Sequence, residues 1–238
     1  MIYNIFNPTA GAGLGNKIGK QMDEALKARH VPVQSYATQF SGHATALSKL
    51  AVQEGADTVL SIGGDGTALE VARGLLGSDV ALGIIPAGTG NDFRKTLGIP
   101  ADPNRALETA LQKPAQATDV GLINGQLFLN EIGTGFDVAV LDYANKAKKY
   151  CRGLLPYLYG VICALFRFRP IPMIYSIDDG PEEEKDVFVI AAANGGIIGG
   201  GITIAPDAKA DDGLLDIVIV DRIKWYKLPL RLIGLLRG

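Results

Sequence analysis

The chain has 238 residues, of which 47% are hydrophobic and 20% are charged, with 23 Lys and Arg against 25 Asp and Glu. This composition excludes intrinsic disorder and supplies apolar residues for one large domain or two modest ones. A formal net charge of -2 argues against a dedicated nucleic-acid binder, which carries a basic surplus. Cys151 and Cys163 cannot form a disulfide framework and no signal peptide is predicted, so we expect a cytoplasmic protein.

The first half of the chain alternates short apolar runs with helical patterns. We expect strands at residues 2–6, 33–37, 58–62 and 82–85. Between the first two, apolar residues recur every four positions from Leu14 to Leu26, which predicts one buried helix face, and Ser41 is a predicted N-cap of the next helix. Such alternation predicts an α/β domain with a parallel sheet and helices on both faces.

The regular alternation ends near Asp119, which predicts two domains, 1–119 and 120–238. In the second domain we expect strands at residues 126–132, 173–177, 187–193 and 214–220. One helical stretch is expected between them, from residue 138 to residue 168. The second domain is therefore predicted to be rich in β structure.

Glycine-rich segments follow three of the predicted strands, at residues 11–15, 63–67 and 86–92. Ligands bind beyond the carboxyl ends of the strands in parallel sheets, and glycine lets backbone amides approach a phosphate. The three segments together therefore predict a nucleotide site. The chain has no P-loop motif, and residues 11–16 lack the third glycine of a dinucleotide fingerprint, so a nicotinamide-linked enzyme is disfavoured.

The segment GGDGT at residues 63–67 resembles a signature shared by diacylglycerol, sphingosine and NAD kinases. NPTAG at 7–11 and PAGTGNDF at 86–93 are similar to the diacylglycerol kinase family and not to NAD kinases. Further similar segments are GHA at 42–44, DVG at 119–121, NEIGTGFD at 130–137, PDAK at 206–209 and DDGL at 211–214. The resemblance covers nearly the whole chain.

This resemblance implies a bacterial lipid kinase, dependent on ATP and Mg²⁺, that phosphorylates the hydroxyl of diacylglycerol or a related lipid in phospholipid biosynthesis. It implies a Rossmann-like ATP-binding domain followed by a β-rich lipid-kinase domain. The implied ATP contacts are Asn7, Pro8, Thr9, Ala10, Gly11, Thr38, Gly64, Asp65, Gly66, Thr67, Ala68, Leu69, Glu70, Thr89, Asn91 and Asp92.

The resemblance also implies two roles for magnesium. Asp65 is the implied catalytic residue, holding a magnesium network near the phosphates with Asn91, Asp92 and Asp119. A structural magnesium site is implied at the Lys209 carbonyl, the Asp212 carboxylate and the Leu214 carbonyl, with Asp119 beside them. Oxygen ligands of this kind suit a hard cation.

The sequence departs from the family in three places. The family's proton acceptor lies in a motif similar to Val-Asp-Gly-Glu, which is absent before Gly238, so we expect a fragment of a longer kinase. The alternative is a non-catalytic nucleotide- or lipid-binding relative that has lost its base. Leu69 stands where Asn is common, and Ala12 stands where a basic residue is common, with Lys17 or Lys20 as substitutes.

A lipid substrate implies contact with the inner face of a membrane. The uncharged run within the predicted helix, residues 153–166, has 14 residues and is too short to span a bilayer. Its basic flanks are Lys146, Lys148, Lys149, Arg152, Arg167 and Arg169. They suit an anionic surface, but packing of this helix on the β domain is an equal alternative. The tail at residues 222–238 is also basic, with Trp225 and Tyr226, and dimerisation is left open.

Overall fold

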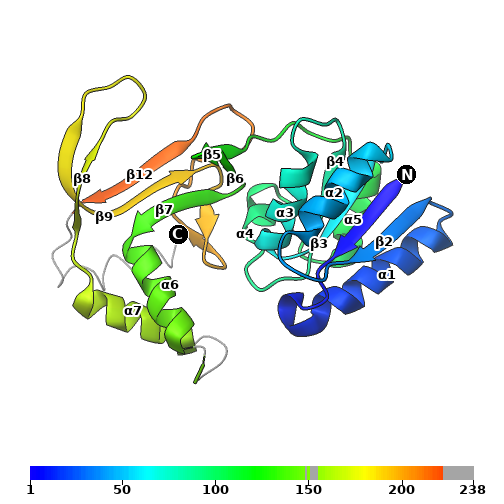
Figure 1. Ribbon diagram of the computed structural model, residues 1–238, viewed down its shortest axis with the longest axis horizontal. Coiled ribbons are helices and arrows are strands. Elements are labelled where there is room, and N and C mark those ends of the chain that lie inside the picture. Colours follow the sequence, from blue (N-terminus) through cyan, green and yellow to red (C-terminus); the bar gives the residue numbers. More distant parts are fainter. Residues whose placement is uncertain (148, 151–154, 222–238) are drawn as a thin grey trace.

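The computed structural model describes residues 1–147, 149–150 and 155–221, and within them it has an α/β part followed by a β-rich part (Figure 1). The first part contains a parallel sheet in the order β2-β1-β3-β4. Its strands are β1 (Ile2–Phe6), β2 (Val33–Ala37), β3 (Thr58–Gly63) and β4 (Ala81–Pro86). The α/β prediction is therefore confirmed.

Helices cover both faces of this sheet. They are α1 (Leu14–Ala28), α2 (His43–Gln53), α3 (Asp65–Leu75), α4 (Asp92–Thr96) and α5 (Pro103–Gln112), and a 3-10 turn, η1 (Ala10–Gly13), precedes α1. Met22 and Leu26 of α1 are fully buried against one face, together with residues of α5, while α2 and α3 pack against Tyr3 and Ile5 on the other. Burying a side chain of this size contributes about 1.5–3 kcal/mol, so the alternation of inward-facing residues decides the layers.

Two details at the helix starts differ from the predictions. Leu14, expected on the buried face of α1, is 45% exposed at the first position of the helix. Ser41 does not cap α2, which begins at His43 with Gly42 as its N-cap in the left-handed region, at φ 87°. The cap comes instead from Glu70 of α3, whose carboxylate accepts hydrogen bonds from the amides of Gly42 and Ala44 at 2.9 and 3.3 Å.

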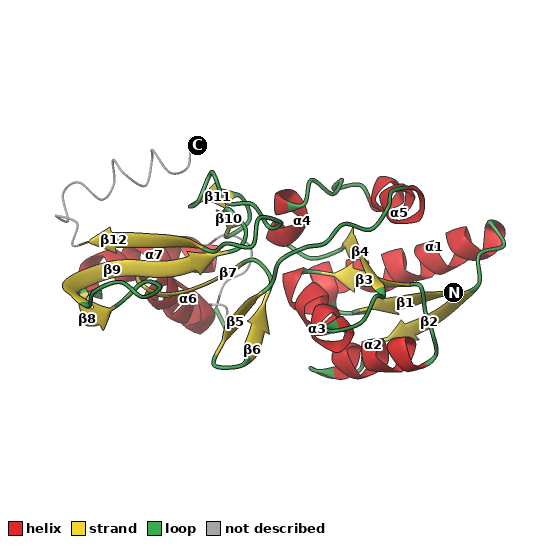
Figure 2. Ribbon diagram, turned by 90° about the horizontal axis from the view of Figure 1, so that it is seen from above, coloured by secondary structure: helices red, strands yellow, loops and turns green. Residues whose placement is uncertain are grey.

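The second part contains an antiparallel sheet in the order β12-β9-β7, with β8 also paired to β9 (Figure 2). Its strands are β7 (Glu131–Gly135), β8 (Ile171–Tyr175), β9 (Glu183–Ala193) and β12 (Asp216–Asp221). Two short antiparallel pairs flank it, β5 (Gly121–Ile123) with β6 (Gln126–Phe128) and β10 (Ile197–Ile198) with β11 (Ile202–Thr203). The β-rich prediction is confirmed.

The single strand expected at residues 126–132 is wrong, because β6 and β7 are separate strands there. The chain leaves the first pair at Asn130, whose carbonyl oxygen accepts the amides of Asn194 and Gly195, both at 2.8 Å. The single helical stretch expected at 138–168 is likewise two helices, α6 (Phe136–Ala147) and α7 (Leu155–Arg167). The two helices pack together, and Phe136 stacks on Phe188 of β9 with centroids 4.7 Å apart.

The two parts are joined through polar contacts at buried side chains. Asn194 is fully buried and its Nδ2 donates to the carbonyl oxygens of Asp119 and Leu129, at 2.8 and 2.7 Å. Asp92 of α4 accepts the amide of Gly200 at 2.8 Å, so α4 lies beside the β10–β11 pair (Figure 2). These contacts bring the second part against the loop that follows β4.

Candidate active site

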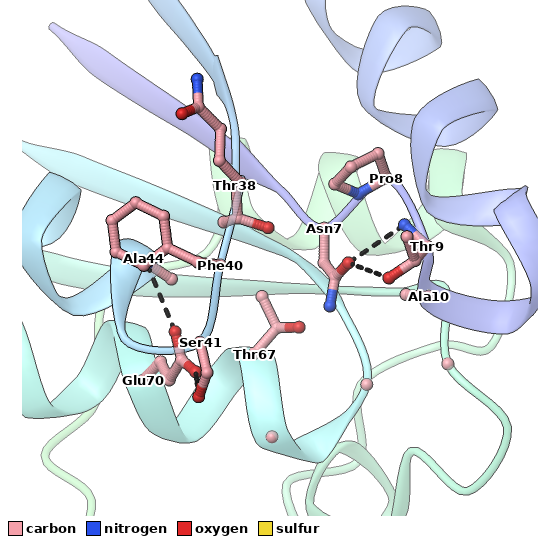
Figure 3. Close-up of a pocket in the computed structure, with 14 residues that line it drawn as sticks. Asn7, Pro8, Thr9, Ala10, Thr38, Phe40, Ser41, Ala44, Thr67 and Glu70 are labelled. Carbon is pink, nitrogen blue, oxygen red and sulfur yellow. Dashed lines mark hydrogen bonds between the residues drawn. The ribbon is translucent and has the colours of Figure 1, made fainter.

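A cavity of about 570 Å³ opens at the carboxyl ends of β1, β2 and β3 (Figure 3). It is lined by Asn7, Pro8, Thr9, Ala10, Thr38, Gln39, Phe40, Ser41, Ala44, Gly64, Gly66, Thr67, Glu70 and Gly88. These residues come from the loops after all four strands and from the first turns of α2 and α3. The structure therefore brings the glycine-rich segments together at one edge, as expected for parallel strands.

Glycine allows two of these loops to pack backbone against backbone. A Cβ on Gly88 would overlap the Cα of Gly64 and would lie 2.8 Å from Asn91 Oδ1. Gly11 is in the left-handed region, at φ +55°, and a Cβ there would overlap the carbonyl oxygen of Ala87. With no side chains at these two positions, a ligand in the cavity can approach the backbone of both loops closely.

Two asparagines hold the shape of these loops. Asn7 Oδ1 accepts the amide of Thr9 at 3.0 Å and its hydroxyl at 2.9 Å (Figure 3). Asn91 Oδ1 accepts the amide of Gly88 at 3.0 Å, while its Nδ2 donates to the Gly88 carbonyl at 2.8 Å. Asn91 has a φ of 49°, a conformation that Asn tolerates better than most residues. The side chains of Asn7 and Asn91 therefore hold the backbone of the two loops in place.

Glu70 organises the cavity wall that follows β2. Besides capping α2, its Oε1 accepts the hydroxyl of Ser41 at 3.4 Å, and Thr45 Oγ1 donates to its backbone carbonyl at 2.7 Å. The carboxylate thereby fixes residues 40–44 against the start of α3 (Figure 3). The exposed ring of Phe40, 65% accessible, stacks on His43 at 4.7 Å and faces the cavity.

Asp65 and Asp92 converge on the far side of the Gly64–Gly88 contact. Asp65 Oδ1 accepts the amide of Phe93 at 2.9 Å, and among the described residues its Oδ2 accepts no hydrogen bond. A Cβ placed on Gly90 would lie 3.4 Å from Asp65 Oδ2 and 3.3 Å from Asp92 Oδ2, so the two carboxylates face the same glycine. Asp92 is buried and also pairs with Lys95 Nζ at 2.7 Å. Two converging carboxylate oxygens fit the donor set that Mg²⁺ prefers.

Some residues predicted to contact ATP do not line the cavity: Gly11, Asp65, Ala68, Leu69, Thr89, Asn91 and Asp92. Ala68 and Leu69 pack instead with Ile84 and Phe93 in a core cluster. Conversely, five lining residues were not predicted from the sequence to contact ATP: Gln39, Phe40, Ser41, Ala44 and Gly88. An aromatic residue shortly after a strand is the one signal that would have indicated Phe40.

The structure places Asp119 against the loop at residues 209–214. Asp119 Oδ2 accepts the amide of Gly213 at 2.7 Å, and its backbone amide donates to the Ala210 carbonyl at 2.7 Å. Asp212 Oδ1 accepts the amide of Leu214 at 3.0 Å. Within residues 1–147, 149–150 and 155–221, no group of three or more His, Cys, Asp or Glu side chains is arranged to hold a metal ion. A magnesium site at Lys209, Asp212 and Leu214 thus stays a prediction.

Glu131, at the start of β7, is a half-buried carboxylic acid, and no role was predicted for it from the sequence. Burial, followed by repulsion from Asp137 and Asp92, raises the pKa of Glu131 from 4.5 to about 7. Burial likewise raises the pKa of Tyr157, with further contributions from Asp137, Asp92 and Glu131. A carboxyl group with a pKa near neutrality is typical of functional sites.

Glu131→Gln is expected to make the protein relatively more stable at high pH. Because the folded protein holds the Glu131 proton more tightly than the unfolded chain, raising the pH from 4.5 through 7 costs wild-type stability. The glutamine side chain of the variant has no proton to lose. The difference in unfolding temperature between variant and wild type should therefore grow in the variant's favour from pH 5 to pH 8. An equal difference at both pH values contradicts the raised pKa, and the exposed Glu182→Gln serves as control.

An α/β domain with glycine-rich loops at one edge of its parallel sheet, joined to an antiparallel β domain, is the class of protein that this geometry defines. Residues 2–123 match the diacylglycerol kinase catalytic domain, and residues 130–238 match the YegS C-terminal NAD kinase beta sandwich-like domain. The chain belongs to the diacylglycerol kinase family of lipid kinases.

Individual relatives agree with this placement. The chain is 35% identical over 228 residues to a diacylglycerol kinase of Mycobacterium tuberculosis (strain ATCC 25618 / H37Rv), covering 93% of this chain and 74% of the relative. It is 33% identical over 223 residues to that of Bacillus subtilis (strain 168), covering 92% and 73%. A solved diacylglycerol kinase structure from Bacillus anthracis str. Sterne is similar with a TM-score of 0.72 and 29% identity, over 94% of this chain and 74% of that chain.

Proposed function

We propose that this protein is a lipid kinase that uses ATP and Mg²⁺ to phosphorylate the hydroxyl of diacylglycerol or a related lipid. The observation that carries this proposal is the position of the Asp65 and Asp92 carboxylates at Gly90, next to the glycine-lined cavity. Phosphoryl transfer needs positioned phosphates, charge neutralisation and a proton acceptor. Transfer of labelled γ-phosphate from Mg-ATP to a lipid acceptor tests the proposal.

Each part of the proposed site has one role. The loops at residues 7–11 and 86–91 bind the phosphates through backbone amides, and Asp65 with Asp92 would hold Mg²⁺. When bound, Mg²⁺ neutralises phosphate charge during transfer. The half-buried Glu131, with its pKa of about 7, is suited to accept the proton of the lipid hydroxyl, because a general base works best near the operating pH. Glu131→Gln should then lose turnover without losing affinity for ATP.

Phe40→Ala is expected to raise the KM for ATP about tenfold and to leave kcat nearly unchanged. The exposed Phe40 ring offers a stacking surface for adenine at the cavity wall, and base–aromatic stacking contributes about 1–3 kcal/mol. Steady-state kinetics with varied ATP measure this effect. Phe40→Trp, which keeps an aromatic face, should retain the wild-type KM. An unchanged KM in Phe40→Ala contradicts adenine binding at this position.

The outer face of α7 supports contact with a membrane. Leu155, Leu158, Tyr159, Ile162 and Phe166 are exposed at helical spacing, while Pro156, Gly160 and Ala164 face inward. The described cations near this helix are Lys146, Lys149, Arg167 and Arg169. Lys148, Arg152 and residues 222–238, with Trp225 and Tyr226, lie outside the described residues. An apolar face flanked by cations fits an anionic bilayer surface.

None of the helices in the described part of the chain is long and apolar enough to span a bilayer. Contact through the α7 face therefore predicts peripheral binding. Leu158→Glu should weaken co-sedimentation with phosphatidylglycerol vesicles at least about fivefold, because a charge replaces an inserted apolar side chain. Leu122→Glu, at an equally exposed residue of β5, should bind like wild type. Equal loss in both variants would mean that the α7 face has no special role.

A further inference from the structure

A second cavity, of about 430 Å³, adjoins the first and shares Gly88 with it. It lies between α1, the loop after β4, α4 and the start of α5. Its lining residues are Leu14, Lys17, Ile18, Gln21, Pro86, Ala87, Gly88, Asn91, Arg94, Ala101, Asp102, Pro103 and Asn104. Of these residues, Asn91 was predicted to contact ATP, and Lys17 was named as a substitute for the basic residue that is common after residues 7–11. The volume is typical of small-molecule sites.

Two cations line this second cavity without a carboxylate partner. Lys17 is exposed on α1, and neither it nor Arg94 forms an ion pair with any residue that the structure describes. Arg94 Nη1 donates to the carbonyl of Ile99 at 2.9 Å, which fixes the guanidinium, while its buried Nε has no hydrogen-bond partner among the described residues. A guanidinium that is held in place at the wall of a cavity offers a fixed positive charge, which suits a phosphate.

The other charged residue in the described wall is Asp102, and its carboxylate already has a structural partner. Asp102 Oδ1 accepts the amide of Arg105 at 2.9 Å and caps α5. The cavity therefore carries two positive charges against one negative charge. Such a balance favours an anionic ligand.

The rest of the wall is neutral and mixed. Gln21 Nε2 donates to Asn104 Oδ1 at 2.9 Å, leaving one more amide hydrogen on Gln21 and two on Asn104 for a ligand. Leu14, Ile18 and Pro103 supply apolar surface. A wall of this kind fits a small organic molecule that carries a phosphate better than a bare inorganic ion.

We propose that this second cavity binds a phosphomonoester, with Lys17 and Arg94 contacting the phosphate and Gln21 and Asn104 contacting the remainder. This site goes beyond the proposed kinase reaction, since Lys17, Gln21, Arg94 and Asn104 do not line the nucleotide cavity that it adjoins at Gly88. It adjoins the catalytic region through α4: Arg94 follows Phe93, whose amide binds Asp65, and Asn91 closes the Gly88 loop. A ligand here would therefore contact the elements that position Asp65.

Calorimetry tests the site with glycerol 3-phosphate as probe, on the whole chain saturated with ADP so that the nucleotide cavity is filled. We expect saturable binding that weakens at least about fivefold in Lys17→Gln and in Arg94→Gln, because each removes a cation from the phosphate. Asp102→Asn should bind glycerol 3-phosphate more tightly, because Asn caps α5 equally well and no longer repels the phosphate. Lys49→Gln, an exposed residue of α2 that lines neither cavity, should bind like wild type.

A vesicle-binding experiment distinguishes a soluble phosphomonoester ligand from the headgroup of a lipid. Vesicles containing phosphatidic acid are compared with vesicles that carry an equal charge as phosphatidylglycerol, a phosphodiester. Binding of glycerol 3-phosphate that depends on Lys17 supports the site with a soluble ligand. Binding restricted to phosphatidic acid, again dependent on Lys17, supports it with a lipid headgroup. The proposal is overturned if neither ligand binds, or if Lys17→Gln and Lys49→Gln lose binding affinity equally. Either outcome counts whether or not the protein transfers phosphate.

Discussion

Replacing Asp65 with Asn is expected to reduce phosphate transfer by roughly 10²–10³-fold while the protein keeps its fold. The asparagine side chain retains an oxygen that can accept the amide of Phe93, so the start of α3 and the start of α4 stay joined. What the variant loses is the negative charge at the oxygen that faces Gly90 and Asp92. Lipid-dependent turnover of Mg-ATP measures the loss, and thermal unfolding measures the fold.

A matched control and a second readout make the Asp65 result specific. Asp79→Asn removes the same charge from an exposed loop and should keep wild-type turnover. Affinity for ADP without Mg²⁺ should change little in Asp65→Asn, because the proposed phosphate contacts are backbone amides and not this carboxylate. If Asp65→Asn turns over like wild type, Asp65 has no part in the chemistry.

Gly88→Ala is expected to lower the affinity for ADP at least about tenfold and to lower the free energy of unfolding by about 1–3 kcal/mol. The new Cβ would overlap Gly64, so the loops after β3 and β4 must separate and their amides move away from the phosphates. Isothermal titration and chemical denaturation measure the two effects. Gly66→Ala, whose Cβ would have open space around it, should not lower stability. Wild-type ADP affinity in Gly88→Ala would show that the contact between the two loops does not shape the site.

Local pattern was sufficient to predict the fold and the edge at which the cavity lies. Strands separated by amphipathic helices must be parallel, and parallel strands place their following loops at one edge. The segments at 63–67 and 86–92 therefore had to meet. Their mutual contact at Gly64 and Gly88 depends on backbone conformation, which spacing along the chain does not reveal.

The wall of the cavity that follows β2 could not be predicted in the same way. Its residues carry no glycine motif, and their position depends on Glu70, which lies 28 residues from Gly42 in the sequence. Ser41 had the right residue type for an N-cap, but a carboxylate from another helix takes that task. The hydrogen bonds of Glu70 hold the segment that places the Phe40 ring at the cavity wall.

The surroundings of the carboxylates could not be predicted from the sequence either. The sequence grouped Asp92 and Asp119 around Asp65, whereas the structure keeps Asp92 beside Asp65 at Gly90 and directs Asp119 toward Gly213. Glu131 stood in a recognised segment without a role, because its raised pKa arises from burial and from Asp137 and Asp92, which only the folded chain brings near it. Electrostatic environment is a property of tertiary structure, and motifs do not encode it directly.

The most direct test is transfer of labelled γ-phosphate from Mg-ATP to lipid in mixed micelles, with diacylglycerol, monoacylglycerol and sphingosine offered in parallel. We expect a labelled lipid with at least one of these acceptors, and we expect it to be lost in Asp65→Asn. The contradicting result is a protein whose unfolding temperature rises with ATP but which gives no labelled lipid from any acceptor. That outcome would identify a nucleotide-binding relative without kinase activity.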